Sequence, residues 1–429
     1  MKQTTKRVWY VTAGFLAFVL AAGLALGIYY VAVLRDTIEQ VATPEKPTTL
    51  LSLYVLSDDP AQAVSQMKGY VFGICSVESD QDELAQMQQK LSEALGQEPA
   101  TASYADLFSL ADALYGQSCR AMVLNEAYLD SMAEAEGYAW LRDGIRKVDS
   151  YEFEEQEEPA PSESTSIGQT DPPESMPQTF VMYISGIDTF GKLSARSRSD
   201  VNILAVVNTK ANRIFLLSTP RDYYVSFAAT GGKKDKLTHA GIYGIRSSVD
   251  ALERLYGVTV DYYLRINFSG FVDVIDALGG IEVYSQQDFE VEGIKQYQKG
   301  YNQLTGIEAL AFARERYSFA AGDYQRAQNQ MEVIRAVVDK CTSPAILKNY
   351  RGVMNGIAGS FQTNMPQNQI ESLVAMQLVG RKQWEISTYA ATGANAYRET
   401  YSMPGRKLFV ILPDLSSIEQ AKQKIRAAS

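Results

Sequence analysis

Aspartates and arginines stand at the ends of several apolar segments in the C-terminal half of this chain. Asp188 follows one such segment, and Asp200 precedes the next. Arg221 and Asp222 follow a third, and Pro220 restricts the backbone of the turn that carries them. Because α/β proteins place their sites at strand ends, we expect these charged side chains to share one site. A turn cap or a surface ion pair is the alternative for each residue taken singly.

A second cluster of arginines and polar residues follows further along the chain. Arg314 and Arg316 are two residues apart, so they would diverge in a helix, and we expect a helix end or extended backbone there. Asp323, Arg326 and Gln330 have the spacing of one helix face. A solvated charged face is the alternative, but such faces are more often rich in Lys and Glu. The planar guanidinium of arginine suits phosphate oxygens.

Carboxylates and arginines without a set of histidines are typical of phosphoryl transfer. The chain has one histidine, His239, which excludes a zinc site with several histidine ligands. Paired aspartates can hold Mg²⁺ through oxygen ligands, and arginines can neutralise a diphosphate as its charge shifts. No Walker A sequence is present, which argues against a P-loop nucleotide enzyme.

Length and charge narrow the class of protein further. The chain has 429 residues, of which 46% are hydrophobic, so we expect two or three folded units. Its formal net charge is -10. Proteins that coat nucleic acid usually have the opposite charge balance, so we expect no nucleic-acid partner.

The elements that must position the charged residues are short apolar strands alternating with amphipathic helices. This alternation predicts an α/β fold, with a layered α-β-α domain around a central sheet. Strands are expected at 179–188, 201–208, 213–219, 262–267, 281–284 and 408–412. Helices are expected at 247–256, 269–278, 306–316, 323–341 and 416–427.

The first 34 residues predict a membrane anchor. No charged residue occurs between Val8 and Leu34, a stretch longer than the roughly 20 residues that a spanning helix needs. A cleaved signal peptide, the alternative, would have a shorter apolar core. Lysine and arginine before the segment predict residues 1–7 in the cytoplasm, a single transmembrane helix at 8–34, and the remainder outside the cell membrane.

The extracellular part divides at 151–177, which contains many Glu, Pro and Ser and no Lys or Arg. Such a composition predicts a solvated linker. It separates a small α/β accessory domain at 48–150 from a C-terminal domain at 178–429. The accessory domain shows no chemical constellation, so a spacer or partner-binding role is the default expectation.

The cysteines leave two possibilities open. Cys75 and Cys119 lie in the same expected domain and could form a disulfide outside the cell. Together with Cys341 they number three, so at least one has no partner within the chain. Small buried hydrophobic side chains are the other interpretation.

At this point the chain resembles the LytR–CpsA–Psr family of Gram-positive envelope proteins, most closely its CpsA-like branch. The resemblance covers about 178–429. It rests on the stretches YISGID (183–188), SRSDVNILAVVN (197–208), TPRDYYV (219–225), KDKLTHAGIYG (234–244), DYYLRINFSGFVDVIDALGGIEVY (261–284) and ARERYSFAAGDYQRAQNQ (313–330).

The resemblance implies a phosphotransferase that takes a glycopolymer from a polyprenyl (di)phosphate carrier and attaches it to peptidoglycan. The polymer would be capsular polysaccharide or similar to teichoic acid. Asp188 and Asp200 would hold Mg²⁺, or Mn²⁺ in its place. The residues that would bind the pyrophosphate are Arg221, Arg314, Arg316, Arg326, Gln330 and, as a weaker candidate, Lys236. Asp222 and Asp323 would orient the arginines, and an apolar tunnel between sheet and helices would hold the polyprenyl tail.

The same residues fit other functions. A non-catalytic protein that binds polyprenyl diphosphate or glycan would use these arginines without turnover. A lipid pyrophosphatase would use water as the acceptor. Transcriptional regulation is disfavoured by the acidic charge and the expected outward topology. One departure from the family pattern is Gln328 and Asn329, where many relatives carry a further arginine.

Overall fold

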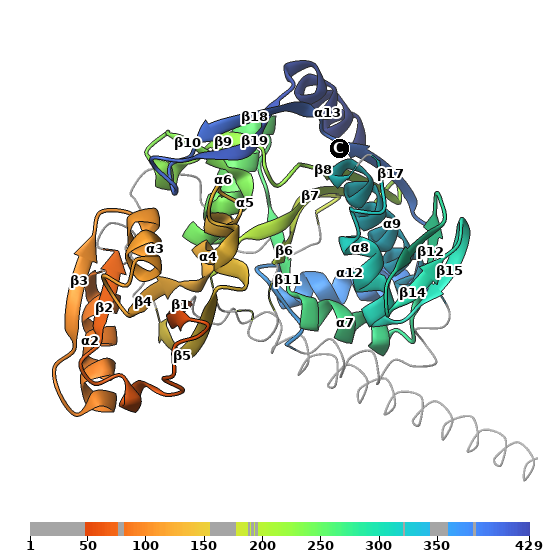
Figure 1. The fold of residues 1–429 in the computed structure, drawn as a ribbon. Coiled ribbons are helices and arrows are strands. Elements are labelled where there is room, and N and C mark those ends of the chain that lie inside the picture. Colours follow the sequence, from red (N-terminus) through yellow and green to blue (C-terminus); the bar gives the residue numbers. More distant parts are fainter. Residues whose placement is uncertain are drawn as a thin grey trace, which may run out of the picture.

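The computed structural model describes two α/β modules that lie side by side (Figure 1). The ranges described are 48–75, 81–154, 177–187, 189, 193, 196–320, 322–343, 359–380 and 383–429. The expected anchor at 8–34, most of the expected linker and Asp188 lie outside these ranges, as does the side chain of Asp323. Among the helices within the described ranges, none combines the length and the apolar character needed to cross a membrane.

The N-terminal module (48–154) contains a five-stranded sheet in the order β3-β2-β4-β1-β5. Its strands are β1 (Thr48–Leu56), β2 (Val71–Cys75), β3 (Ala100–Tyr104), β4 (Ala121–Asn125) and β5 (Ile145–Glu154). Its helices are α2 (Gln81–Leu95), α3 (Leu107–Tyr115) and α4 (Glu126–Ala133). The apolar runs of the sequence at 50–56, 70–75 and 121–124 lie within or beside β1, β2 and β4. Strands β3 and β5 were not expected from the sequence, and β5 continues into the expected linker.

Side-chain caps fix the starts of two helices in this module. Asp106 accepts hydrogen bonds from the backbone N–H groups of Phe108 and Ser109 at the start of α3. Asn125, the last residue of β4, accepts one from Ala127, so α4 begins immediately after the strand. The path of β4 therefore sets the direction in which α4 leaves the sheet.

The three cysteines are free thiols in this structure. Cys75 and Cys119 are buried in one hydrophobic cluster with helix α3. Burial raises the pKa of Cys119 above its ordinary value, which keeps it a neutral apolar group. Of the two possibilities that the sequence left open for Cys75 and Cys119, a disulfide or small buried hydrophobic side chains, the structure has the second.

The C-terminal module (177–429) is built on a six-stranded sheet in the order β16-β11-β6-β7-β8-β17. The strands are β6 (Thr179–Ile187), β7 (Ser199–Asn208), β8 (Arg213–Ser218), β11 (Tyr262–Ile266), β16 (Phe361–Thr363) and β17 (Glu385–Ala390). β7 is antiparallel to β6 and β8, whereas β11 runs parallel to β6 and β17 parallel to β8. The mixed sheet agrees with the expected α/β class.

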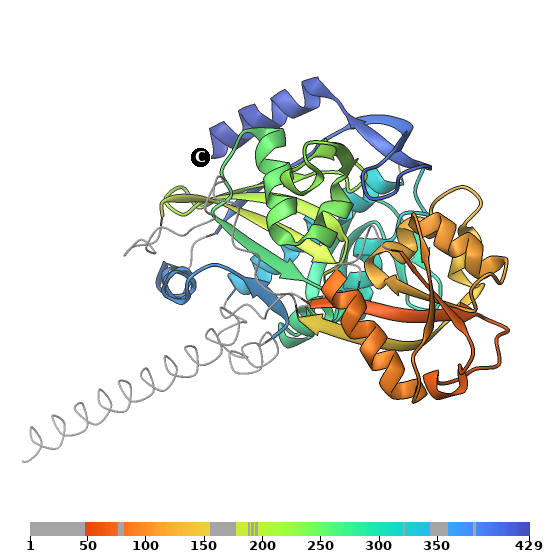
Figure 2. The same cartoon turned by 90° about the vertical axis from the view of Figure 1, so that its left-hand side faces the viewer.

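Alternating side chains give this sheet two apolar faces, and helices cover both (Figure 2). Leu204 and Val206 of β7 face one cluster, and Ile203 and Ala205 face the other. The first cluster packs against α6 (Ile245–Tyr256) and α13 (Leu415–Ala428), the second against α9 (Asp323–Cys341). The expected layered arrangement is therefore confirmed for this module.

The remaining elements surround the sheet. The helices are α5 (Leu237–Ala240), α7 (Phe268–Ala277), α8 (Gly306–Arg314) and α12 (Gln367–Gly380). Two-stranded pairs are formed by β9 (Tyr224–Ser226) with β10 (Lys234–Lys236), β12 (Ile281–Ser285) with β15 (Gly300–Leu304), β13 (Phe289–Val291) with β14 (Lys295–Tyr297), and β18 (Gly393–Glu399) with β19 (Lys407–Pro413). The expected strand at 408–412 lies within β19, which pairs with β18 and not with the main sheet.

Candidate functional site

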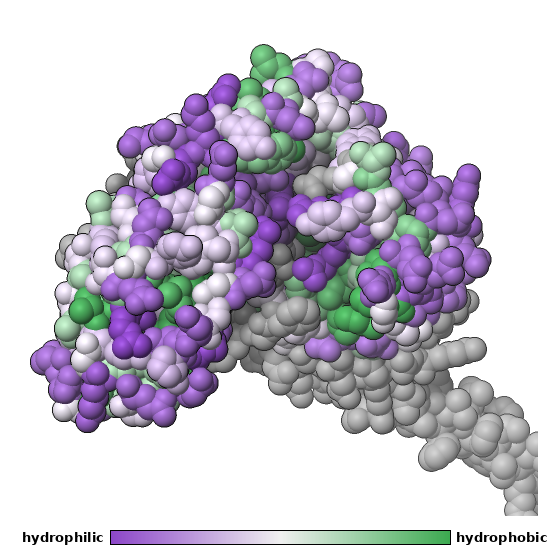
Figure 3. Space-filling model, in the orientation of Figure 1, coloured by the Kyte–Doolittle hydropathy of each residue, from purple (hydrophilic) through white to green (hydrophobic). Residues whose placement is uncertain are grey.

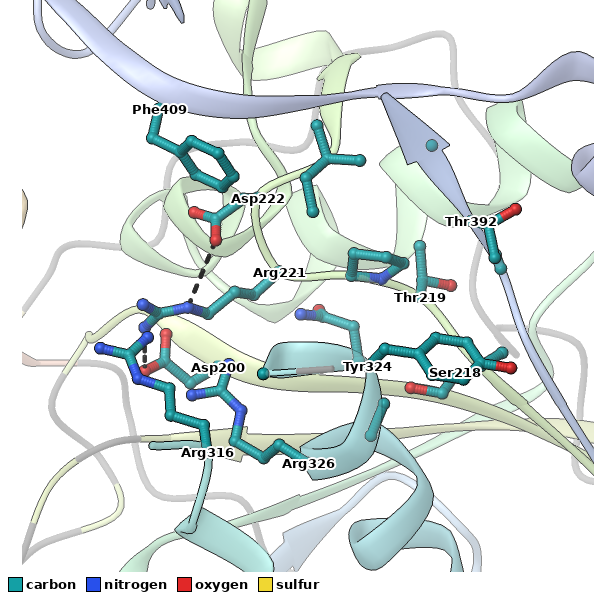
Figure 4. Close-up of a pocket in the computed structure, with 18 of the residues that line it drawn as sticks. Asp200, Ser218, Thr219, Arg221, Asp222, Arg316, Tyr324, Arg326, Thr392 and Phe409 are labelled. Atoms are coloured by element: carbon teal, nitrogen blue, oxygen red, sulfur yellow. Dashed lines mark hydrogen bonds and ion pairs between the residues drawn. The ribbon is translucent and has the colours of Figure 1, made fainter. Parts of the chain in front are cut away.

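Strand register brings Asp200 and Arg221 together at one edge of the main sheet. Asp200 is the second residue of β7, and Arg221 follows the end of the antiparallel strand β8. Arg221 Nη1 donates a hydrogen bond to Asp200 Oδ2 at 2.8 Å (Figure 4). β6 ends at the same edge, where Ile187 pairs with Ser199. This edge is where the sequence predicted the charged residues to meet.

Asp222 and Lys236 form a buried pair beside Arg221. Lys236 Nζ lies 3.1 Å from Asp222 Oδ1, and Lys236 is only 1% exposed. Arg221 Nε lies 3.6 Å from Asp222 Oδ2, so Asp222 faces both cations. Asp222 therefore lies between Arg221 and Lys236, close enough to contact both.

The short helix α5 contacts both Asp200 and Arg221. Thr238 Oγ1 donates a hydrogen bond to Asp200 Oδ1 at 2.8 Å, and the Thr238 backbone N–H donates to the Arg221 carbonyl. Gly241 follows α5 and packs against the start of β7, where an added Cβ would lie 2.6 Å from the Ser197 carbonyl oxygen. Only glycine permits this close approach, which holds the end of α5 against the start of β7.

The second cluster approaches from the helices on the other side. Arg314 is the last residue of α8, and the following Glu315 is extended, as expected for this stretch. Arg316 and Arg326 point toward the Asp200–Arg221 pair (Figure 4). Gln330 on α9 donates a hydrogen bond to the Ala313 carbonyl at 3.3 Å and so joins α9 to the end of α8.

A carboxylate from the N-terminal module completes the cluster. Glu134, which directly follows α4, contacts Arg221 Nη2 at 3.2 Å and Lys236 Nζ at 2.9 Å. Arg198 lies before β7, pairs with Asp130 at 2.8 Å and approaches Glu134 at 3.8 Å. The sequence shows no chemical constellation in the accessory domain, yet Glu134, at the C-terminal end of α4, contacts the cluster of the other module.

Electrostatics keep these carboxylates ionised. Burial alone would raise the pKa of Asp200, but Arg221, Arg198 and the Thr238 hydrogen bond hold it well below its usual range. Burial opposes ionisation of Glu134 too, yet Lys236, Arg221 and Arg198 lower its pKa to about 2. For Lys236, burial is outweighed by Asp222 and Glu134, which raise its pKa. At neutral pH the site is therefore a network of ion pairs.

Two cavities meet at this network, and the surface is hollowed there between the modules (Figure 3). The first has a volume of about 630 Å³ and is partly polar, with Thr219, Thr392, Asn395, Tyr324 and Phe409 in its lining. Both cavities are lined by Glu134, Arg142, Asp200, Arg221, Arg316, Arg326 and Gln330. The charged cluster therefore stands at the junction of the two spaces.

The second cavity, of about 680 Å³, is mainly apolar. It extends from the charged cluster between the sheet and helices α7, α8 and α9. Its apolar lining includes Ile184, Ile187, Val201, Ile266, Phe268, Phe271, Ile307, Leu310, Val333 and Ile334. Arg314 and Arg316 both line it, so the two guanidiniums reach one cavity as expected. A long apolar chain with an anionic head is the kind of ligand that fits this combination.

For a metal, the described residues supply only part of the expected ligand set. No group of three His, Cys, Asp or Glu residues is arranged to hold an ion within the described ranges. Asp200 faces both cavities and offers hard oxygen donors, as Mg²⁺ prefers. Mg²⁺ commonly uses one or two carboxylates together with substrate phosphates and water, so Asp200 fits such an ion.

The structure thus brings most of the expected site residues into one cluster or its cavity walls: Asp200, Arg221, Asp222, Arg314, Arg316, Arg326, Gln330 and Lys236. Lys236 differs from the others because it lines neither of the two cavities. Sequence reasoning missed Glu134, Arg198, Thr238 and Arg142. Arg198 and Thr238 lie within motifs that carried the family resemblance, whereas nothing in the local sequence distinguishes Glu134.

His239 is structural in this arrangement. It is fully buried, with Nδ1 at 2.6 Å from Asp235 Oδ1 and 2.8 Å from Ser402 Oγ, and Nε2 at 2.9 Å from Ser131 Oγ. These partners occupy both ring nitrogens, as expected for a hydrogen-bonded core histidine. Because Ser131 belongs to α4, the histidine also joins the two modules.

Fold and site together define an α/β protein with a cluster of arginines, lysine and carboxylates beside an apolar cavity. The LytR_cpsA_psr family model matches residues 145–412. This match covers more than half of the chain, and the chain belongs to that family. The match begins within β5 of the N-terminal module, before the start expected at 178.

Curated relatives match a little under half of the chain. The chain is 35% identical over 190 residues to the Bacillus cereus polyisoprenyl-teichoic acid–peptidoglycan teichoic acid transferase TagU, which covers 44% of this chain and 61% of the relative. It is 32% identical over 199 residues to the Enterococcus faecalis protein of the same name, covering 46% and 65%. The match therefore spans less than two thirds of either relative.

Among solved structures, Bacillus subtilis TagV is similar in fold. Its TM-score is 0.50 at 26% sequence identity, with 58% of this chain and 97% of that chain covered. This agreement supports the mixed α/β architecture of the C-terminal module.

Proposed function

We propose that this protein transfers a glycopolymer from a polyprenyl diphosphate carrier to peptidoglycan. In this reaction an acceptor hydroxyl attacks the phosphorus next to the polymer. A phosphodiester to peptidoglycan forms, the bond within the diphosphate breaks, and polyprenyl phosphate leaves, while the hydroxyl proton is released. Family membership and the transferase names of the relatives support this reaction.

The observation that carries the proposal is the position of the arginines. Arg221, Arg316 and Arg326 lie at the junction of the two cavities, of which the second is the more apolar. A polyprenyl diphosphate has its phosphates between an apolar tail and a hydrophilic polymer. The arginines between the two cavities would therefore lie beside the phosphates of a bound donor. Guanidinium groups that bind the diphosphate oxygens would stabilise the charge that develops as the leaving phosphate departs.

The two cavities then have different occupants. The polyprenyl tail lies in the apolar cavity, where Phe271, Leu310 and Val333 exclude water from it. The polymer and the acceptor hydroxyl enter through the first cavity, near Thr219 and Asn395. In this arrangement the lipid end and the polymer end of the donor lie in different cavities, with the arginine cluster between them.

Mg²⁺, or Mn²⁺ in its place, would be held by Asp200 and by Asp188, the residue after Ile187 in the sequence. When bound, the ion would neutralise negative charge on the phosphate oxygens. Asp222 would orient Arg221 through their contact of 3.6 Å. Asp323, at the start of α9, would also orient the arginines.

The proposed location is the outer face of the cell membrane. Residues 8–34 would form the single transmembrane helix, with residues 1–7 in the cytoplasm and both modules outside, where peptidoglycan is accessible. Protease added to intact cells would then digest the C-terminal module. Protection of that module until the cells are lysed would contradict this topology.

The proposed reaction is tested by incubating the purified full chain with polymer-linked polyprenyl diphosphate and peptidoglycan, with Mg²⁺ or with a chelator. We expect polymer bound to peptidoglycan with Mg²⁺ and little with the chelator. Free polymer with no attachment would instead indicate a pyrophosphatase. An unchanged donor would indicate a protein that binds the lipid without turnover.

A further inference from the structure

Helix α4 of the N-terminal module is docked on the C-terminal module through buried contacts. Ser131 shares a hydrogen bond of 2.9 Å with His239, and both residues are fully buried. Asp130 on the same helix pairs with Arg198 at 2.8 Å. Glu134 follows the last residue of this helix, so the docking of α4 carries its carboxylate into the site of the other module.

The Glu134 carboxylate contacts three cations from three different parts of the C-terminal module. Oε1 lies 3.2 Å from Arg221 Nη2 and 3.8 Å from Arg198 Nη1, and Oε2 lies 2.9 Å from Lys236 Nζ. One anion whose oxygens are shared between two guanidiniums and an ammonium resembles the way in which proteins bind a phosphate group. Phosphate oxygens could take the places of both carboxylate oxygens.

The cations, rather than the helix, account for the charge on Glu134. A carboxylate at the C-terminal end of a helix faces the negative end of the helix dipole, and burial also disfavours its charge. Its pKa is nevertheless about 2, because Lys236, Arg221 and Arg198 outweigh the cost of burial. Glu134 is therefore a counter-ion of this cation cluster.

Glu134 is also the most accessible carboxylate on Arg221. Its side chain is 27% exposed, against 14% for Asp200 and 5% for Asp222. It lines both cavities, so a change of rotamer alone could move its carboxylate away from the cations. Lys236 lines neither cavity and contacts Glu134, so movement of Glu134 would open Lys236 to a ligand.

We propose that Arg198, Arg221 and Lys236 form a phosphate subsite, which the Glu134 carboxylate of the N-terminal module occupies until a phosphate group of the donor displaces it. This inference rests on the proposed function, because it takes the donor to be a lipid-linked diphosphate. It gives the N-terminal module a role in the site: its glutamate competes with the donor and sets the affinity for it.

The test is the affinity of the full chain, purified in detergent, for inorganic pyrophosphate with Mg²⁺, measured by titration calorimetry. Glu134→Gln keeps the size of the side chain but removes its charge and so its competition. We expect this variant to bind pyrophosphate about tenfold more tightly than the wild-type chain, a change of about 1.4 kcal/mol. Unchanged or weaker binding by Glu134→Gln would overturn the proposal.

Glu126→Gln is the matched control. Glu126 is the same residue type on the same helix, and it pairs with Lys147 at 2.8 Å, away from the cluster. We expect this variant to bind pyrophosphate as the wild-type chain does. An equal gain in both variants would show that the general loss of negative charge, and not displacement of Glu134, is responsible, and the proposal would fail.

Lys236 provides an independent readout. In the Glu134→Gln background, Lys236→Gln should remove most of the gain in pyrophosphate affinity, because the ammonium would then contact phosphate. No effect of Lys236→Gln in that background would exclude Lys236 from the subsite. Should Glu134→Gln fail to fold by circular dichroism, Glu134→Asp, which shortens the side chain, should give a smaller gain, and weaker binding would contradict the proposal.

Failure of this inference and failure of the proposed function are distinguishable. A gain in pyrophosphate affinity without any polymer transfer by the wild-type chain would keep the subsite and contradict the transferase. Transfer by the wild-type chain, with no gain in Glu134→Gln, would keep the transferase and contradict the displacement. Absence of pyrophosphate binding in both proteins would contradict the subsite.

Discussion

Asp200 lies in β7 and Arg221 lies just beyond the end of the neighbouring antiparallel strand β8, at the same edge of the sheet, and their side chains are joined by a hydrogen bond of 2.8 Å. Both side chains are largely shielded from solvent, with exposed fractions of 9% for Arg221 and 14% for Asp200. Asp222 and Glu134 contact the Arg221 guanidinium, whereas Thr238 donates a hydrogen bond to Asp200. Arg221 is therefore the residue whose loss should affect the proposed reaction most specifically.

Replacing Arg221 by Ala should lower the rate of polymer transfer by about 10³-fold, because arginine contacts to a transferring phosphoryl group are commonly worth that much. Turnover with lipid-linked polymer and peptidoglycan measures the effect. Arg254→Ala is a suitable control, since Arg254 forms an exposed pair with Asp250 on α6. Equal rates in Arg221→Ala and the wild-type chain would remove Arg221 from the mechanism.

The rim of the apolar cavity provides a second prediction. Ile307 lines this cavity and is 50% exposed, so Ile307→Glu should fold normally but place a charge beside the lipid tail. We expect affinity for polyprenyl phosphate to fall about tenfold or more, since an uncompensated charge in apolar surroundings costs about 1–3 kcal/mol or above. Lipid binding measured by fluorescence reports the change.

The matched control is Leu415→Glu, which introduces the same charge at a residue 83% exposed on α13 and outside the lining of the cavity. It should leave lipid affinity unchanged. A similar loss in both variants would mean that charge alone weakens lipid binding, and the apolar cavity would not be the lipid site.

Ser131 should contribute to the docking of the two modules. Ser131→Ala leaves the buried His239 Nε2 without its hydrogen-bond partner, so we expect a loss of about 1–3 kcal/mol in the free energy of unfolding. Chemical denaturation followed by circular dichroism measures it. Ser372→Ala, which removes an exposed hydroxyl on α12, should change stability far less; comparable losses in the two variants would contradict this role.

The low pKa of Glu134 predicts a dependence of stability on pH. Its pKa is about 2 in the folded chain against an ordinary value of 4.5, so the unfolded chain binds the proton more readily. The stabilisation from Glu134 is therefore present above pH 4.5 and lost as the pH falls toward 2. Glu134→Gln should show a shallower loss of unfolding free energy over this range. Parallel curves for the two proteins would mean that Glu134 is not held by the cations.

Much of the C-terminal module follows from its sequence. The apolar segments before Asp188 and around Asp200 and Arg221 predicted strands, and the antiparallel register then places their ends at one edge. The extended backbone at Glu315, between Arg314 and Arg316, also followed from their spacing. Local pattern was sufficient in these places because each residue is positioned by the element next to it in the chain.

The contacts between modules could not be predicted in the same way. Glu134 meets Arg221 across 87 positions of sequence, and Ser131 meets His239 across 108. Neither α4 nor its flanking residues carry a pattern that indicates a distant partner. The burial of Lys236 likewise depends on Glu134 and Asp222 together, so its absence from the cavity walls is a property of the assembled structure.

The most direct measurement of the central claim follows the phosphate itself. A donor labelled with ³²P in the phosphate next to the polymer is incubated with the wild-type chain, Mg²⁺ and peptidoglycan. Transfer predicts that the label moves into the peptidoglycan fraction together with the polymer, while unlabelled polyprenyl phosphate is released. Label that stays in the lipid, or that appears only in free polymer, would contradict the assignment as a glycopolymer transferase.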